Sequence, residues 1–180
     1  MKIAIGSDHR GVDVARRVMA LLVEQGHGVA SSICGDERAS DYPDMAYAVS
    51  SAVASGEAEL GVLVCGSGIG MSIAANKVRG VRAALVHDEV GAEQARSHAD
   101  ANVLCLPADL LGMRLIERIV MVFVSAEFSG GRHERRVSKI EAIESGAYAP
   151  PAEGTGDATD PAGEPRADLA SPESLLRRRG

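Results

Sequence analysis

Residues 60–70 read Leu-Gly-Val-Leu-Val-Cys-Gly-Ser-Gly-Ile-Gly. The first six are apolar or small and show no polar alternation, which is typical of a strand in a parallel sheet covered on both faces. The glycine-rich residues that follow predict a tight turn, and a short helix is expected at 71–77. This stretch therefore indicates an α/β protein in which a buried strand ends in a glycine-rich turn.

The rest of residues 1 to about 148 alternates in the same way between short apolar runs and runs with helical spacing. We expect strands at 2–6, 29–33, 60–65, 82–86 and 102–106. We expect helices at 12–24, 44–54, 71–77, 89–99, 110–126 and 132–144. The alternation predicts an open, doubly wound α/β fold with a five-stranded parallel sheet. In such sheets the ligand binds beyond the carboxyl ends of the strands, so polar residues there are the first site candidates.

The composition restricts the class of protein. The 180 residues are 46% hydrophobic but only 3% aromatic, which predicts one domain with an aliphatic core. A formal net charge of -6 argues against a nucleic-acid partner, and no apolar run approaches the ~20 residues of a membrane span. The N-terminus does not resemble a signal peptide, and three widely spaced cysteines do not suggest a disulfide framework. A soluble, cytoplasmic protein is expected.

Residues 149–180 differ in composition from the rest of the chain. They are rich in Ala, Pro, Gly, Glu and Asp and hold almost no large apolar residue before Leu175. Such a segment cannot offset the entropy cost of ordering, so we predict a disordered, low-complexity tail. A short contact element at 175–179 is the alternative. Function is expected in the domain of residues 1–148.

The glycine-rich turn predicts an anion site. Glycines at alternate positions let backbone N–H groups approach a ligand, and a helix begins directly afterwards. The spacing matches neither a dinucleotide fingerprint nor a P-loop, and a plain tight turn remains an equal alternative. Cys65 is the last strand residue before the helix, where N–H groups stabilise a thiolate. An inert buried cysteine, as expected for Cys34 and Cys105, is the other interpretation.

Arg132 and Arg136 are four residues apart at the start of a predicted helix, so both project from one face. Two guanidinium groups in this register form a phosphate clamp. A solvated charged face paired with Glu134 and Glu141 explains the same pattern. By position alone, His9, His27, His87 and His98 carry no catalytic assignment.

Five segments together resemble ribose 5-phosphate isomerase B. They are Gly-Ser-Asp-His-Arg-Gly at 6–11, Asp-Tyr-Pro at 41–43, Val-Cys-Gly-Ser-Gly-Ile-Gly-Met-Ser-Ile-Ala-Ala-Asn-Lys at 64–77, Arg-Ala-Ala-Leu-Val-His-Asp at 82–88, and Gly-Gly-Arg-His-Glu-Arg-Arg at 130–136. The resemblance runs from Lys2 to about Ile143 in family order, and its middle motif is highly specific. The broader group includes isomerases of galactose 6-phosphate and allose 6-phosphate.

The resemblance implies a Rossmann-like α/β/α sandwich that forms a homodimer or tetramer, with sites shared between subunits. It implies an aldose–ketose isomerase of the pentose phosphate pathway that acts on a sugar phosphate and uses no cofactor and no metal. Proton transfer through an enediolate also agrees with the residues, because backbone amides at a helix start can stabilise the developing oxyanion. A metal-assisted hydride shift would need a set of His and carboxylate ligands that the sequence does not display.

The resemblance also implies a role for particular residues. Cys65 is the expected base, while Asp8 and His98 are expected to serve ring opening, with His98 as the proton donor. The enediolate is expected to be held by Gly66, Ser67, Gly68, Ile69 and Gly70, and the phosphate by His9, Arg132 and Arg136. Tyr42 is expected to line the pocket.

Two positions depart from the family pattern at the expected substrate site. Ala99 stands where the family usually has Asn, and Asp109 stands where it commonly has a phosphate-binding Arg. A carboxylate near a phosphate replaces attraction by repulsion. Three readings therefore stay open: a ribose 5-phosphate isomerase, an isomerase of another four- to six-carbon sugar phosphate, and a non-catalytic sugar-phosphate-binding protein.

Overall fold

The structure is a computed structural model that describes residues 1–34 and 41–150. Of the predicted tail, residues 151–180 lie outside the described residues. Within the described ranges, no helix is long and apolar enough to cross a bilayer.

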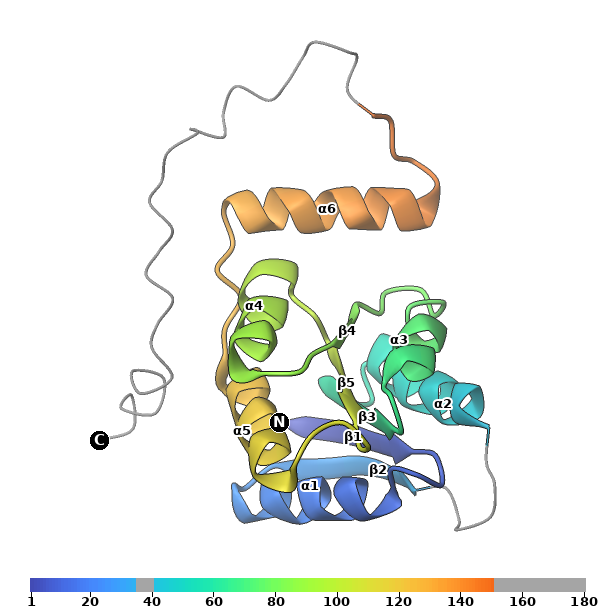
Figure 1. Cartoon of the computed structure of the whole chain (residues 1–180). Coiled ribbons are helices and arrows are strands. Elements are labelled where there is room, and N and C mark those ends of the chain that lie inside the picture. Colours follow the sequence, from blue (N-terminus) through green and yellow to red (C-terminus); the bar gives the residue numbers. More distant parts are fainter. Residues whose placement is uncertain (35–40, 151–180) are drawn as a thin grey trace, which may run out of the picture.

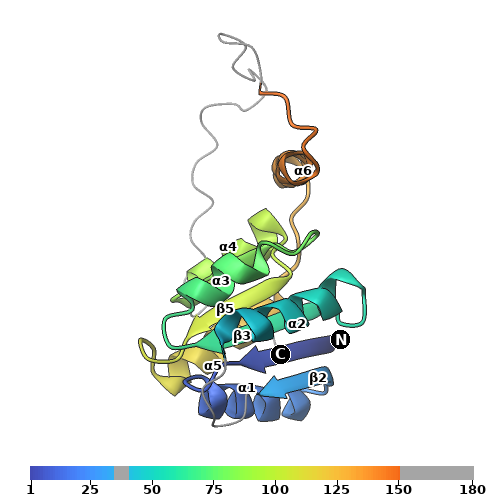
Figure 2. The ribbon, with the colours of Figure 1, turned by 90° about the vertical axis from the view of Figure 1, so that its right-hand side faces the viewer.

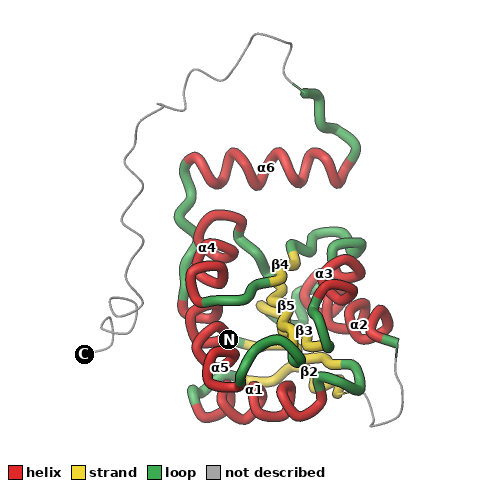
Figure 3. The backbone as a smooth tube through the Cα atoms, in the orientation of Figure 1, coloured by secondary structure: helices red, strands yellow, loops and turns green. Residues whose placement is uncertain are grey.

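The described chain is a five-stranded parallel sheet with helices on both faces, so the predicted α/β/α fold is confirmed (Figures 1 and 3). The strand order is β2-β1-β3-β5-β4. The strands are β1 (Lys2–Ser7), β2 (Gly28–Cys34), β3 (Leu60–Cys65), β4 (Ala83–Leu85) and β5 (Val103–Pro107). The helices are α1 (Val12–Glu24), α2 (Tyr42–Ala54), α3 (Ile69–Ala75), α4 (Glu89–Ala99), α5 (Met113–Ser125) and α6 (Arg132–Ser145).

Two aliphatic layers sandwich the sheet. Val62 and Val64 of β3 belong to the layer that also contains residues of α1, α4 and α5. Leu63 and Cys65 belong to the opposite layer, with residues of α2 and α3. Because side chains alternate along a strand, the last residue of β3 points toward α2 and α3, and both faces of β3 are buried. This explains why its sequence lacks polar alternation.

Helix ends differ from the predicted ends where local turn chemistry decides. We predicted a helix from residue 44, but α2 begins at Tyr42, with Pro43 in the first turn, where a missing N–H costs nothing. We predicted a helix from residue 110, but α5 begins at Met113, because Leu110 N–H closes a separate turn on the Pro107 carbonyl and Gly112 has an extended backbone (φ -74°, ψ 148°). The predicted helix at 71–77 begins at Ile69, directly after Gly68 in the left-handed conformation.

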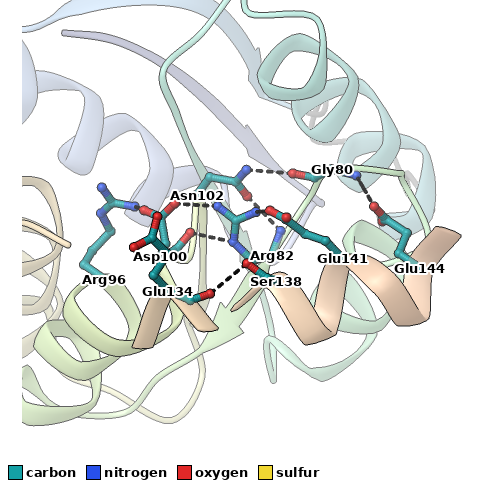
Figure 4. Close-up of polar contacts among 9 residues, drawn as sticks. All are labelled: Gly80, Arg82, Arg96, Asp100, Asn102, Glu134, Ser138, Glu141 and Glu144. Atoms are coloured by element: carbon teal, nitrogen blue, oxygen red, sulfur yellow. Dashed lines mark hydrogen bonds and ion pairs between the residues drawn. The ribbon is translucent and has the colours of Figure 1, made fainter. Parts of the chain in front are cut away.

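Helix α6 lies apart from the sandwich, beyond the edge strand β4 (Figures 1 and 2). Only His133 and Val137 of this helix are buried, while Ile140 and Ile143 are 47% and 60% exposed. Its second half is attached by polar contacts, in which Glu144 accepts from Gly80 N–H at 3.0 Å (Figure 4). A mostly apolar cavity of about 450 Å³ lies between α6 and the β4 edge.

Candidate active site

The loops after β1, β3 and β5 meet at the carboxyl edge of the sheet. These strands are neighbours, with β3 in the middle, so their ends lie side by side. Backbone hydrogen bonds join the loops: Asp8 N–H donates to Val64 O at 3.2 Å, and Ala108 N–H donates to Cys65 O at 2.8 Å. The structure therefore brings Asp8, Cys65 and Asp109 together.

The sulfur of Cys65 faces the glycine-rich turn. Gly68 N–H donates to Sγ at 3.1 Å, and Cys65 is 4% exposed. Gly68 has φ +74°, a conformation that L side chains rarely adopt. An N–H aimed at sulfur stabilises negative charge there. Beside it, Ser67 and Ile69 are exposed, and Ile69 N–H donates to Ser67 Oγ at 3.4 Å.

Asp8 presents a buried, fixed carboxylate beside this turn. It is 6% exposed, and its Oδ1 accepts from Arg10 N–H at 2.9 Å and from Gly11 N–H at 3.1 Å. Two charge-assisted bonds to backbone amides hold the group in one orientation. The next residue, His9, is exposed at the same edge.

Asp109 forms an ion pair with Arg10. Arg10 Nε donates to Asp109 Oδ2 at 2.7 Å, and the two side chains are 57% and 40% exposed. The pair lies against Gly66, where an added Cβ would sit 2.5 Å from Asp109 Oδ2 and 3.0 Å from Arg10 Nε. The carboxylate that replaces the expected arginine is therefore partnered by a cation from the neighbouring loop.

Tyr42 also lies at this edge. A Cβ added at Gly70 would sit 2.5 Å from both Cε2 and Cζ of the Tyr42 ring, so the ring covers the first turn of α3. Tyr42 is 42% exposed, which leaves part of the ring open to solvent beside the turn. This position agrees with the predicted pocket-lining role, which stays a prediction.

Cys105 differs from Cys65 in its surroundings. Burial raises the pKa of the Cys105 thiol strongly, and the neighbouring Cys65 adds to the rise. A neutral thiol with no exposed surface agrees with the predicted inert role of Cys105, which stays a prediction. The matching prediction for Cys34 concerns a side chain outside the described part of the structure.

The remaining predicted residues lie at the opposite edge of the sheet. Helix α4 runs back from the end of β4 and stops at Ala99, just before β5 begins. Four strand steps of about 3.3 Å each separate Val103 from Pro107, the residue that pairs with Cys65. His98 and Ala99 thus lie near the start of β5, which is about 13 Å along the strand direction from the level of Cys65 of the same protomer.

The first turn of α6 lies against His98, at the edge of the sheet opposite Cys65. The His98 and His133 rings are stacked, with centroids 4.1 Å apart and planes 5° from parallel. Arg132 Nε donates to His133 Nε2 at 3.4 Å, and Arg136 follows Arg132 by one helical turn. One protomer therefore divides the predicted site between two edges: Asp8, His9, Tyr42, Cys65–Gly70 and Asp109 at one, and His98, Ala99, Arg132 and Arg136 at the other.

Sequence reasoning assigned no role to Arg10 or His133, although both stand inside quoted motifs. Arg10 could have been found from its charge, which is opposite to that of Asp109, because the two residues follow the two strands that flank β3. His133 could have been found from its place between two arginines at the start of a helix. Among residues 1–34 and 41–150, no group of three or more His, Cys, Asp or Glu side chains is placed to hold a metal ion.

Comparisons with known proteins agree with this fold. The family described as Ribose/Galactose Isomerase matches residues 3–140. Ribose-5-phosphate isomerase B of Escherichia coli (strain K12) is 42% identical over 143 residues, 79% of this chain and 96% of that protein. D-erythrulose-4-phosphate isomerase of Pectobacterium atrosepticum is 38% identical over 141 residues, 78% of this chain and 93% of that protein.

A solved structure gives the same result. The structure of ribose-5-phosphate isomerase B from Clostridium thermocellum has a TM-score of 0.80 and 43% identity to this chain. The match covers 82% of this chain and 100% of that one. The chain thus belongs to the ribose/galactose isomerase family of sugar-phosphate isomerases.

Proposed function

We propose that this protein interconverts D-ribose 5-phosphate and D-ribulose 5-phosphate by proton transfer through an enediolate. The observation that carries the proposal is the Gly68 N–H donated to Cys65 Sγ at the carboxyl end of β3, beside the buried Asp8 carboxylate. The relatives named as ribose-5-phosphate isomerase B support this choice of substrate.

In the proposed reaction, the Cys65 thiolate takes the proton from C2 of the open-chain aldose. The electrons of that C–H bond form the C1=C2 double bond, and the carbonyl oxygen O1 becomes negatively charged. The proton on O2 then moves to O1, and the thiol returns its proton to C1, which yields the ketose. One proton leaves C2 and one is returned to C1, so the atoms balance and Cys65 ends the cycle as a thiolate.

The negative charge on O1 needs preorganised donors. The turn after Cys65 offers backbone N–H groups at the start of α3, and the exposed Ser67 hydroxyl stands beside them. Such donors cost no reorganisation during the reaction, which is the usual reason for their large effect on rate. The Asp8 carboxylate is fixed by two backbone amides, and we propose that it accepts the proton of the sugar's ring-closing hydroxyl group during ring opening.

We further propose that the working unit is a homodimer with shared sites. His98, Arg132 and Arg136 lie at the edge opposite Cys65, so one protomer cannot bring them to the same sugar. A two-fold axis that places this edge of one copy against the Cys65 edge of the other completes two identical sites. The apolar cavity between α6 and β4, with exposed Ile140 and Ile143, offers surface for the second copy.

The activity test compares purified wild type with Cys65→Ala and with Cys105→Ala as the matched control. We expect turnover of ribose 5-phosphate in the wild type, loss of at least a thousandfold in Cys65→Ala, and near wild-type kcat in Cys105→Ala. Full activity in Cys65→Ala would end the proposed mechanism.

Subunit mixing tests the shared site. Cys65→Ala and His98→Asn homodimers should each be nearly inactive. After joint refolding, half of the dimers are mixed, and each mixed dimer holds one intact site, so about a quarter of wild-type activity should return. Activity that does not rise on mixing, or a monomer by sedimentation, contradicts the shared site.

A second candidate is isomerisation of another sugar phosphate. It is favoured by Ala99, which lacks the side-chain donor expected there, and by a relative named D-erythrulose-4-phosphate isomerase. A panel of four- to six-carbon sugar phosphates decides between the two by kcat/KM. Binding by calorimetry without exchange of the substrate C2 proton would indicate a non-catalytic sugar-phosphate-binding protein instead.

A further inference from the structure

We propose that Arg10 binds the phosphate of the substrate, and that Asp109 is the residue that positions it. This inference rests on the proposed function, because it assigns a further substrate contact to the same site. It reverses the sign of the effect expected for Asp109: the carboxylate assists phosphate binding through Arg10 where a lone carboxylate would oppose it.

The location of Arg10 is the first argument. It follows the exposed His9 on the loop after β1, and its backbone N–H donates to the buried Asp8 carboxylate at 2.9 Å. Its side chain extends over Gly66, the residue directly after Cys65, where an added Cβ would lie 3.0 Å from Nε. Arg10 therefore stands at the mouth of the glycine-rich turn.

The geometry of the guanidinium group is the second argument. Nε donates to Asp109 at 2.7 Å, and within the described residues the Arg10 side chain has no other hydrogen-bond or ion-pair partner. Nε is occupied, but the two terminal nitrogens keep a parallel pair of N–H groups, and the side chain is 57% exposed. A planar pair of this kind matches two oxygens of a phosphate and does not match a neutral hydroxyl group.

The support beneath Asp109 is the third argument. Its backbone N–H donates to Gly66 O at 3.0 Å, so the carboxylate is attached to the turn that follows Cys65. Gly66 leaves the room that the pair occupies, since a Cβ there would lie 2.5 Å from Asp109 Oδ2. An exposed ion pair contributes little to stability, so its main effect is to fix a long, flexible arginine in one place.

The test measures binding of inorganic phosphate and of ribose 5-phosphate by calorimetry, together with kcat and KM. The variants are Arg10→Gln, Asp109→Asn and their double combination. Arg17→Gln is the matched control, because Arg17 forms a similar exposed pair with Glu117 at 2.6 Å between α1 and α5. Loss of one bidentate phosphate contact corresponds to about a tenfold rise in Kd.

We expect Arg10→Gln to raise the Kd for inorganic phosphate, the Kd for ribose 5-phosphate and KM about tenfold each, with kcat within about twofold of wild type. We expect Arg17→Gln to leave both Kd values, KM and kcat unchanged. Asp109→Asn should raise Kd by about threefold in the wild type and not at all in the Arg10→Gln background. This dependence on Arg10 is what a merely structural role of Asp109 would not produce.

Two results overturn the inference. Arg10→Gln that behaves like Arg17→Gln removes the assigned contact, and Asp109→Asn that tightens phosphate binding shows that Asp109 repels the ligand. Failure of the proposed function gives a different result, namely a wild type that binds phosphate in an Arg10-dependent way but turns over no ribose 5-phosphate. A wild type that binds neither ligand contradicts both.

Discussion

The imidazole rings of His98 and His133 are stacked, with centroids 4.1 Å apart and planes 5° from parallel. The contact joins the last turn of α4 to the first turn of α6. His133 is 8% exposed and accepts a hydrogen bond from Arg132 at Nε2, whereas His98 is exposed. The buried His133 ring thus holds the His98 ring, which is predicted to act in ring opening. This contact lies at the first turn of α6, which also carries Arg132 and Arg136, the arginines predicted to bind the phosphate.

His133→Ala should therefore lower kcat about tenfold with a smaller change in KM, because His98 loses the ring that orients it. His133→Phe retains a flat stacking partner and should recover most of the loss. Steady-state kinetics and the His98 imidazole resonances in NMR spectra follow the effect, with His87→Ala, an exposed histidine, as the control. Equal kcat in His133→Ala and wild type would show that His98 needs no such support.

Gly68→Ala should damage both the site and the fold. Gly68 has φ +74°, and an added Cβ would overlap Leu85 Cδ1 and lie 3.3 Å from the Leu106 carbonyl carbon. We expect unfolding free energy to fall by about 2–4 kcal/mol and turnover to fall with it, since the amide aimed at Cys65 Sγ must move.

Gly56→Ala is the matched control for Gly68→Ala. Gly56 has φ +78°, and nothing lies within 4 Å of an added Cβ. Only the backbone cost of about 1 kcal/mol is expected, with kcat unchanged. If Gly68→Ala and Gly56→Ala lost the same stability and the same activity, the conformation of the Gly68 turn would not be needed for catalysis.

Most of the fold could be predicted from the sequence because its signals are local. The uninterrupted apolar run of β3 and the helical spacing of α1 and α4 require only neighbouring residues, and the predicted bounds of these elements, 60–65, 12–24 and 89–99, agree with the structure. The start of α5 was missed because the extended backbone of Gly112 decides it, and apolar spacing does not record backbone conformation.

The candidate site could be predicted only in part. Polar residues after the first, third, fourth and fifth strands, Asp109 included, were expected together, since parallel strands end at one edge. The Arg10–Asp109 pair joins residues 99 apart in the chain, and its existence depends on β5 lying beside β3, which the strand sequences do not specify. The position of His98 follows from the direction of α4, which returns to the opposite edge before β5 begins.

Asp100 should be important for stability. It has φ 45°, an unfavourable value for a residue with a side chain, and its carboxylate accepts from Arg82 Nη2 at 2.6 Å and from Arg96 Nη1 at 2.8 Å (Figure 4). Both arginine side chains are less than one-fifth exposed. Asp100→Ala leaves them without this anion and should cost about 3 kcal/mol of unfolding free energy.

Asp100→Gly separates charge from backbone strain. It removes the same carboxylate but relieves the left-handed conformation, so denaturant unfolding should place it about 1 kcal/mol above Asp100→Ala in stability. Equal stability of the two variants would mean that φ 45° costs nothing here.

The buried thiol of Cys105 should make stability decline in alkali. Burial raises its pKa above the ordinary value of 9.0, so above pH 9 the unfolded chain loses this proton while the folded protein keeps it. The unfolded state then binds fewer protons, and unfolding free energy should fall by up to about 1.4 kcal/mol per pH unit from this group. Below pH 9 both states hold the proton and the contribution of this group to stability is constant.

Cys105→Ala, which lacks the thiol, should be less stable at every pH because of its cavity but should show a shallower decline of unfolding free energy between pH 9 and 10.5. Denaturant unfolding across this range measures both slopes, and parallel slopes would mean that Cys105 ionises as readily in the folded protein as in the unfolded chain.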